Sequence, residues 1–414
     1  MIRALSSLCL GLVVVGGGWT ASQCVLAADA PRRETVPLSG QRFQAALVAI
    51  DAPPTKAGDA AVPSTFGTIT LLRADEKRTL PLAELVSWGA LAEATAAAQI
   101  YLADGSLLVA EVLTADKDAI KVDSAVFGEQ TIPLELLAAI LLHPPADAQR
   151  RDRFAERILS AGRDADLVYL ENGDELTGTM LDINDKAVDL DAAVGKVAVE
   201  RAKIVGIAFN PALVAAARTK GPRVLAGFGD GSRLVALSLA VRGVDVELAL
   251  FGGLKWKAPR DALVFVQPLA GKATYLSDLT AESYRHLPFL NTSWPYRTDR
   301  NVTGTQLRAG GRPVAKGIGM HSASRLTYRL NGLYRRFAAD VALDDQVGSG
   351  GSVVVRVFVD GEERYKSDVI RGGSPPVPVA VDVTGGKQLS LIVDFAERGD
   401  ELDRVNWLNA RLAE

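Results

Sequence analysis

Cysteine is scarce in this 414-residue sequence, and its placement is informative. The only two cysteines, Cys9 and Cys24, lie in the first 28 residues, a segment with the pattern of a removable leader. Removal of that segment would leave a chain with no thiol. The mature protein is therefore expected to contain no disulfide and no cysteine-ligated metal.

Long apolar runs are also missing, apart from one at the N-terminus. Arg3 gives a positive start, residues 8–18 are apolar, and small residues follow up to Ala28. This order is typical of a secretory signal peptide, so we expect residues 1–28 to be removed and the protein to be secreted or kept in the periplasm or cell envelope. A transmembrane helix needs roughly 20 apolar residues, so we expect no membrane span in the mature chain.

Neither sign of charge predominates, and histidine is nearly as scarce as cysteine. The 46 basic and 49 acidic residues form no blocks of one sign, so nothing favours a nucleic-acid partner. The chain has three histidines, His143, His286 and His321, and no Gly-x-Ser-x-Gly elbow or complete phosphate-binding loop accompanies them. We therefore expect a protein that is not an enzyme.

The first two thirds of the chain repeat a pattern of strand, tight turn and strand. Three copies are centred on Asp104-Gly105, Asn172-Gly173 and Asp230-Gly231. Such pairs supply the positive φ angles that two-residue hairpin turns require. Units of about five short strands are expected at residues 40–91 (a degenerate first copy), 96–145, 166–212 and 222–269. Their size is that of a small β-barrel, and they resemble SH3-like or Sm-like barrels.

A helix is expected between the second and third units, at residues 146–164. Phe154, Ile158 and Leu159 lie near one face, and several arginines lie elsewhere. The arginines could form a site for an anionic polymer. We favour a solvated linker helix, because Asp152 and Glu156 balance the positive charge.

The last 140 residues contain an ordered series of short motifs. They are Tyr275-Leu276-Ser277-Asp278-Leu279, Lys316-Gly317-Ile318-Gly319-Met320-His321-Ser322, Asp344-Asp345, Val359-Asp360-Gly361 and Asp403-Arg404-Val405-Asn406-Trp407-Leu408-Asn409-Ala410. In this order, residues 275–414 resemble the NPCBM family. The resemblance implies a galactose-binding-like β-sandwich, or jelly roll, that is not catalytic and can hold galactose-containing glycans.

The whole chain is thus expected to be mainly β, with tandem small β-barrel-like repeats followed by a galactose-binding-like sandwich. The favoured function is that of an exported, non-catalytic protein that binds a carbohydrate, with a galactose-type glycan as the expected partner. The alternative is an extracellular or envelope scaffold that binds another protein and no sugar. Fold alone does not choose between these functions.

Candidate sugar-binding residues lie mainly on loops of the sandwich. Trp294 and Tyr296 occupy a loop where aromatic rings either stack on sugars or anchor the loop. His321 either donates a hydrogen bond to a sugar or packs against the final strand near Asp403. Tyr365 and Arg371 are further polar candidates.

Acidic residues of the sandwich are candidates for catalysis and for metal binding. Asp344 and Asp345 are neighbours on a strand or turn and so do not form an opposed acid and base. Together with Asp403 they are expected first to cap turns, and second to hold a structural calcium ion. No other cofactor is expected. Trp407, in the alternating pattern with Val405, is expected in the core.

Overall fold

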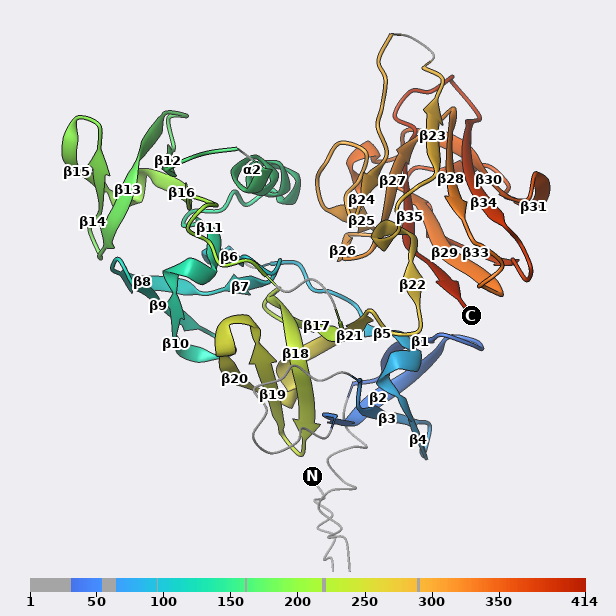
Figure 1. Ribbon diagram of the computed structural model, residues 1–414, viewed down its shortest axis with the longest axis horizontal. Coiled ribbons are helices and arrows are strands. Elements are labelled where there is room, and N and C mark those ends of the chain that lie inside the picture. The colour runs from blue at the N-terminus through green and yellow to red at the C-terminus, as the bar shows by residue number, and fades with distance from the viewer. Residues whose placement is uncertain (1–30, 54–64, 95, 161, 218–220, 289–290) are drawn as a thin grey trace, which may run out of the picture.

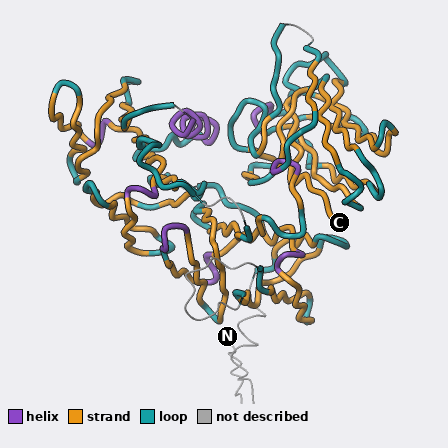
Figure 2. Tube along the Cα trace, in the orientation of Figure 1, coloured by secondary structure: helices purple, strands orange, loops and turns teal. Residues whose placement is uncertain are grey.

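The computed structural model describes residues 31–53, 65–94, 96–160, 162–217, 221–288 and 291–414. The expected signal peptide lies outside these residues. Figure 1 shows an array of small β units, blue to yellow, beside a separate sandwich, orange to red. Strands dominate both parts, and helix α2 (Ala148–Ser160) lies between them (Figure 2). The expected mainly β fold class is confirmed.

The first unit consists of five antiparallel strands, and the other units repeat its order. Its strands are β1 (Arg33–Pro37), β2 (Phe43–Asp51), β3 (Thr68–Arg73), β4 (Glu76–Pro81) and β5 (Leu85–Gly89). The first strand pairs with the second and the fifth. The second strand also pairs with the third, and the third pairs with the fourth. The short 3₁₀ helix η1 (Leu82–Glu84) joins the fourth strand to the fifth.

The other three units have the same strand order, with a 3₁₀ helix before the last strand. In the second unit, two short strands take the place of the second strand. The second consists of β6 (Gln99–Leu102), β7 (Leu107–Val109), β8 (Glu111–Ala115), β9 (Ala119–Ser124), β10 (Gly128–Pro133), η2 (Leu134–Leu136) and β11 (Leu137–Leu141). The third consists of β12 (Asp166–Leu170), β13 (Glu175–Ile183), β14 (Ala187–Ala192), β15 (Gly195–Glu200), η3 (Arg201–Lys203) and β16 (Ile204–Ala208). The fourth consists of β17 (Arg223–Phe228), β18 (Arg233–Arg242), β19 (Asp245–Leu250), η4 (Phe251–Gly253), β20 (Lys255–Pro259), η5 (Arg260–Ala262) and β21 (Leu263–Leu269).

Local chemistry accounts for the turns of these units. Gly231 has φ +91°, a conformation that glycine adopts without strain, and it turns the chain from β17 into β18. In three units the strand before the last ends in proline, which cannot donate to a β ladder and so helps to end the strand there. The first unit begins at β1, ahead of the expected start at residue 40. Its first turn lacks the Asp-Gly pair that marked the other copies, so the sequence pattern missed this strand.

The units are joined into one body. Strand β11 pairs with β16, and β21 pairs with β5, so the second unit joins the third and the fourth joins the first. Units two and four also exchange two hydrogen bonds: Val235 N donates to Ser106 Oγ at 2.8 Å, and Val109 N donates to Ser232 Oγ at 2.9 Å. One hydrophobic core includes side chains of all four units.

Helix α2 packs on the sheet, and its environment differs from that of a solvated linker. Ile158 is fully buried against β11 and β16, and Phe154 and Leu159 are partly buried beside it. Arg151 is also buried and bonds to Glu93. The apolar face was predicted correctly, whereas the solvation of Arg151 was not, because the sandwich packs against this side of the helix.

The C-terminal part is a sandwich of two antiparallel sheets. One sheet has the order β24 (Arg297–Thr298), β27 (Gly317–His321), β35 (Arg404–Ala413), β29 (Arg336–Leu343) and β33 (Val377–Asp382), with β22 (Thr274–Tyr275) also on β35. The other has the order β23 (Ser283–His286), β28 (Ser324–Arg329), β34 (Gln388–Phe395), β30 (Ser352–Val359) and β31 (Glu362–Lys366), with β32 (Ile370–Arg371) also on β30. A small hairpin is formed by β25 (Leu307–Ala309) and β26 (Arg312–Val314).

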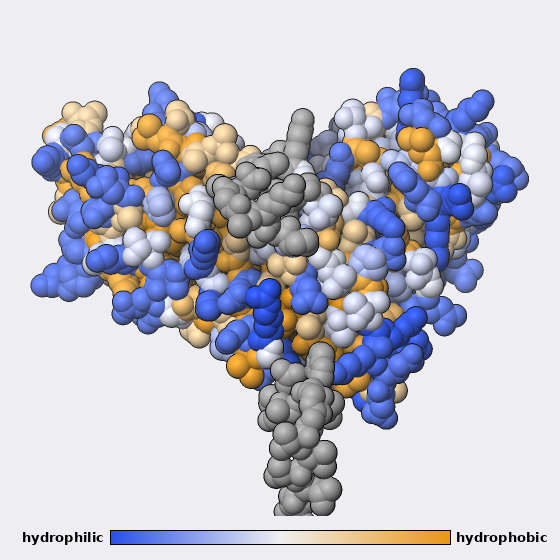
Figure 3. All heavy atoms as spheres, turned by 60° about the horizontal axis from the view of Figure 1, so that its bottom comes forward, coloured by the Kyte–Doolittle hydropathy of each residue, from blue (hydrophilic) through white to orange (hydrophobic). Residues whose placement is uncertain are grey.

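Both sheets bury their facing side chains in one core. Trp407 is completely buried there, with Phe337 beside it at a ring-centre distance of 6.3 Å. The alternation of β35 therefore points Trp407 inward, as predicted. The visible face in Figure 3 shows hydrophobic residues interspersed among hydrophilic ones on both parts of the molecule. In the described ranges, no helix has the length and apolar character needed to cross a membrane.

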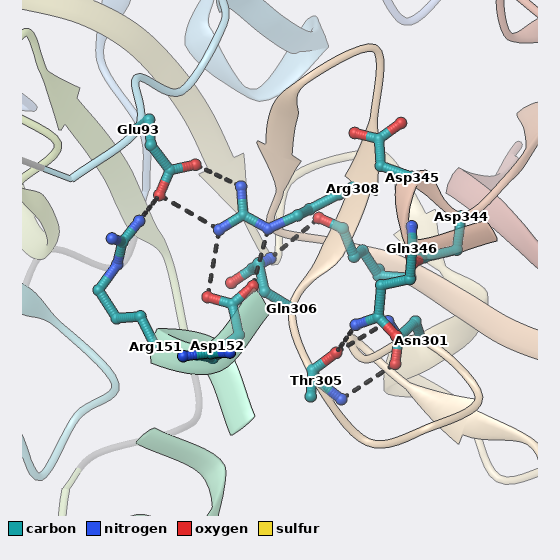
Figure 4. A network of polar contacts seen from close by, with 12 residues as sticks. Glu93, Arg151, Asp152, Asn301, Thr305, Gln306, Arg308, Asp344, Asp345 and Gln346 are labelled. Carbon is teal, nitrogen blue, oxygen red and sulfur yellow. Dashed lines mark hydrogen bonds and ion pairs between the residues drawn. The ribbon is translucent and has the colours of Figure 1, made fainter. Parts of the chain in front are cut away.

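Arg308 connects the sandwich to the repeats. Its guanidinium lies between Glu93, which follows the first unit, and Asp152 of α2 (Figure 4). The Nε atom is 2.7 Å from Asp152 Oδ2, and Arg308 is buried. Glu93 also pairs with Arg151. A second contact joins Arg42 to Asp340, at 2.5 Å. Charge-assisted contacts of this kind hold the two parts in one orientation.

Candidate functional site

Several strands bring polar and aromatic side chains to one end of the sandwich. Strand β27 ends at His321, directly opposite Arg404 at the start of β35. Strand β23 ends at His286, opposite Ser324 at the start of β28. Gly319 permits this arrangement, because a Cβ atom there would lie 2.4 Å from the backbone of the segment at Val302.

Trp294 is held at this end by both histidines. Its indole is stacked on the His321 imidazole, with ring centres 5.0 Å apart and planes 6° from parallel. Its backbone N–H donates to His286 Nδ1 at 3.3 Å, and its carbonyl accepts from Tyr284 Oη at 2.7 Å. His286 meets His321 edge to face at 5.9 Å. The indole is therefore placed by ring contacts and by its own backbone.

The two histidines are neutral under ordinary conditions. Burial lowers the pKa of His321 to about 4, although the negative charge of Asp400 acts in the opposite direction. Burial also lowers the pKa of His286. Since His286 Nδ1 accepts a hydrogen bond from Trp294, its remaining proton is on Nε2. Neutral rings can support a stacked indole without placing a buried charge beneath it.

Two charged side chains lie near the stacked pair of Trp294 and His321. Arg404 is close to the indole, and Asp400 is close enough for its negative charge to act on the His321 imidazole. The Arg404 guanidinium lies 5.9 Å from the centre of the Trp294 ring, and Asp400 lies in the turn just before β35. Both are partly exposed. In the part of the chain that the structure describes, neither side chain forms an ion pair or a hydrogen bond with protein. An aromatic face, a cation and a carboxylate are thus available together at one surface.

The structure brings together some of the predicted site residues and separates others. Tyr296 lies near Trp294, but its ring packs on Tyr284 at 5.1 Å and is partly buried. His321 is buried beneath Trp294, as a packed histidine would be. Tyr365 lies along β31 opposite Val357 and packs against the core.

Arg371 lies at the same end of the sandwich as His321 and forms an ion pair with Glu397. It is opposite Ser352, the first residue of β30, and its Nη2 is 2.6 Å from Glu397 Oε1. The ion pair is exposed. Arg371 therefore lies at the same end of the sandwich as Trp294 but across the sheet from β23, since β32 pairs with β30.

His286, Asp400 and Arg404 were not among the sugar-binding candidates predicted from the sequence. The signal for Arg404 was present, because Val405 and Trp407 alternate inward on β35 and their neighbour Arg404 must then face outward. No comparable pattern marked His286 or Asp400. They come to this end of the sandwich because strands that are far apart in sequence begin or end there.

The candidate calcium ligands have other roles. Asp344 is buried, accepts from Gln346 N at 3.1 Å and accepts from Asn406 Nδ2 at 2.7 Å. Asp345 accepts from two backbone amides, those of Gly310 and Gly311.

Asp403 accepts from Ser352 N at 2.8 Å. Among the described residues, no group of three or more His, Cys, Asp or Glu side chains is close enough to hold a metal ion. These carboxylates cap turns and hold backbone, the first of the expected roles.

Residues 272–413 match the family model described as NPCBM/NEW2 domain. The sandwich is an NPCBM domain. The match covers the two sheets and the site around Trp294, and it leaves the four repeat units outside.

The NPCBM domain is also similar to part of a much longer protein. Over 108 residues, the chain is 31% identical to a Renibacterium salmoninarum protein named "Putative endo-alpha-N-acetylgalactosaminidase". The aligned segment is 26% of this chain and 7% of that protein. The chain thus spans less than a tenth of the length of this curated relative.

Solved structures that match this chain include two from Clostridium perfringens. One, of CBM51-2 with GlcNAc and INT domains from Clostridium perfringens ZmpB, is 30% identical with a TM-score of 0.32, covering 43% of this chain and 37% of that one. The other, of CBM51 from Clostridium perfringens GH95 with methyl-galactose, is 25% identical with a TM-score of 0.31, covering 34% of this chain and 99% of that one.

Proposed function

We propose that the NPCBM domain binds a glycan through the surface formed by Trp294, Arg404 and Asp400. The observation that carries this proposal is the partly exposed indole, stacked on buried His321, with the Arg404 guanidinium beside it and Asp400 near His321. Neither charged side chain has a hydrogen bond or ion pair to protein among the described residues. An aromatic face packs on the C–H groups of a sugar, and charged groups bond its hydroxyls.

A galactose-configured sugar suits this surface best. Its axial 4-hydroxyl leaves the C–H groups of C3, C4 and C5 together on one face, which can lie on the indole. The name of the R. salmoninarum relative refers to an N-acetylgalactosamine linkage, which is consistent with this choice. Galactose and N-acetylgalactosamine are therefore the first ligands to test.

The protein is further proposed to be exported and not catalytic. Its N-terminal 28 residues have the pattern of a signal peptide. Asp344 and Asp345, the candidates for a glycosidase pair, accept hydrogen bonds from backbone amides and do not face each other across an open surface. The role of this chain would then be to hold a glycan at or outside the cell envelope.

Isothermal titration of the mature chain with galactose, N-acetylgalactosamine and glucose tests the proposal. We expect heat of binding for one or both galactose-configured sugars and none for glucose. A chain that binds none of them, and gives no selective signal on a glycan array, would favour the alternative of a scaffold that binds protein.

A further inference from the structure

A cleft of about 1000 Å³ lies between the repeats and the sandwich, away from Trp294. One wall comes from units two and four and includes Tyr101 and Arg233. The other comes from the sandwich and includes Arg300 and Lys316. The two walls belong to parts of the chain that are far apart in sequence. A ligand in this cleft would touch both.

Cationic side chains outnumber the acidic ones in the cleft. The charged lining residues are Arg223, Arg233, Arg300, Lys316, Asp278 and Asp299. Lys316 Nζ lies 2.6 Å from both Asp278 Oδ1 and Asp299 Oδ2. One lysine offsets only one of the two carboxylate charges. The three arginines exceed the one remaining negative charge of the lining, which leaves the cleft with a net positive charge.

Arg233 lies in the cleft with a neutral hydrogen-bond partner. Its Nη1 donates to the neutral Oε1 of Gln306 at 2.8 Å, and no carboxylate of the described residues forms an ion pair with it. Burial lowers the pKa of Arg233, and the positive charges of Arg300 and Arg308 act in the same direction, whereas Tyr101 and the negative charge of Asp152 act in the opposite direction. Arg233 is partly buried, and a partly desolvated cation without a carboxylate ion pair is stabilised by a bound anion.

Arg300 is placed to share such an anion. It lines the same cleft from the sandwich side, and its only ion pair in the described structure is with Glu156, at 3.3 Å. Its side chain remains 41% exposed. Two guanidinium groups on opposite walls can each donate two N–H groups to one carboxylate, the geometry that arginine favours.

We infer that the cleft binds a carboxylate-bearing ligand, held between Arg233 of the repeats and Arg300 of the sandwich. The volume suits a molecule of sugar size or somewhat larger. The carboxylate can belong to a uronic acid or to a plain organic acid. This site is separate from the proposed glycan surface and does not depend on it.

Titration of the mature chain with galacturonate and with succinate tests this inference. Galacturonate differs from galactose only in its carboxylate, and each titration is repeated in Trp294→Ala to remove any contribution of the sandwich end. We expect at least one of the two acids to bind in that variant, with affinity falling as salt is raised. Binding of galacturonate alone would identify a sugar acid, and binding of both would identify the carboxylate as sufficient.

Arg233→Gln should weaken this binding at least tenfold. The matched control is Arg242→Gln, at the other end of the same strand β18, where the side chain is 68% exposed. Arg300→Gln provides a second variant on the opposite wall, should Arg233→Gln fail to fold. Failure of both acids to bind, or equal affinity in all three arginine variants and the parent, would overturn the inference.

Discussion

The Trp294 indole lies parallel to the His321 imidazole, with their ring centres 5.0 Å apart. Because His321 is buried and neutral, it forms a fixed base on which the partly exposed indole rests. The Arg404 guanidinium approaches the same indole at 5.9 Å. Trp294, a loop residue, is thereby held by residues at the ends of β23, β27 and β35. These contacts give its indole a fixed position on the surface.

Trp294→Ala should weaken sugar binding by about 1 to 3 kcal/mol, the scale of losing an aromatic contact. The fold should remain intact, since Trp294 is only partly buried. Titration calorimetry measures the loss, and circular dichroism checks the fold. Tyr365→Ala is the control, because its ring lies on β31 and away from the site. Unchanged affinity in Trp294→Ala would place the sugar elsewhere.

Trp407→Ala should instead destabilise the fold of the sandwich. Its ring is fully buried in the sandwich core, and removing such a ring costs about 3 to 5 kcal/mol. We expect the NPCBM domain to unfold or to lose most of its resistance to urea. A stable Trp407→Ala protein that loses sugar binding would show that the binding face lies on the other side of the sandwich.

The stability of the sandwich should depend on pH through two groups, His321 and Asp403, whose contributions change in opposite directions as pH rises. His321 has a pKa of about 4 in the fold against 6.5 ordinarily, so its contribution rises as pH increases between these values. Burial raises the pKa of Asp403 from 3.8 to about 6, so its contribution falls over nearly the same range. Each is worth at most about 3 kcal/mol.

Asp403→Asn isolates the histidine contribution. The amide oxygen can still accept from Ser352 N, whereas the carboxylate titration is gone. The melting temperature of this variant should therefore rise more steeply from pH 4 to pH 6 than that of the parent. Parallel profiles for the two proteins would show that Asp403 does not titrate in this range.

Residues 271–414 should fold as an isolated fragment. The sandwich core is formed by residues from Leu276 to Leu412 and includes none from the repeats. We expect a single cooperative unfolding transition, with a lower midpoint than in the whole chain, because contacts such as Gln267 with Tyr275 are lost. A fragment that stays unfolded would mean that the repeats complete its core.

Arg308→Ala should loosen the contact between the sandwich and the repeats. The substitution would leave Glu93 and Asp152 close together without the cation that they share, at a cost of about 3 kcal/mol or more. We expect faster proteolysis between the two parts and a larger radius of gyration in solution. Arg329→Ala, which removes an arginine that is 72% exposed, should change neither quantity.

Local patterns were sufficient for much of the architecture. The Asp-Gly turn at Gly231 and the inward alternation of Val405 and Trp407 follow from backbone preference and from the two-residue period of a strand. The ordered motifs of residues 275–414 likewise indicated the NPCBM domain, which the family match bears out. Each of these signals is contained in a short stretch of chain.

Contacts between distant segments were decided by tertiary structure alone. The pairing of β11 with β16, the burial of Arg151 and the stacking of Trp294 on His321 all join residues whose neighbours in sequence give no sign of the partner. Arg308 meets Glu93 across 215 positions of chain. The sequence by itself determined the turns, the strand faces and the family of the last domain, because these depend on local geometry and periodicity. The binding surface, the charged cleft and the joint between the two parts depend on where separate strands end in space, and only the packed fold determines that.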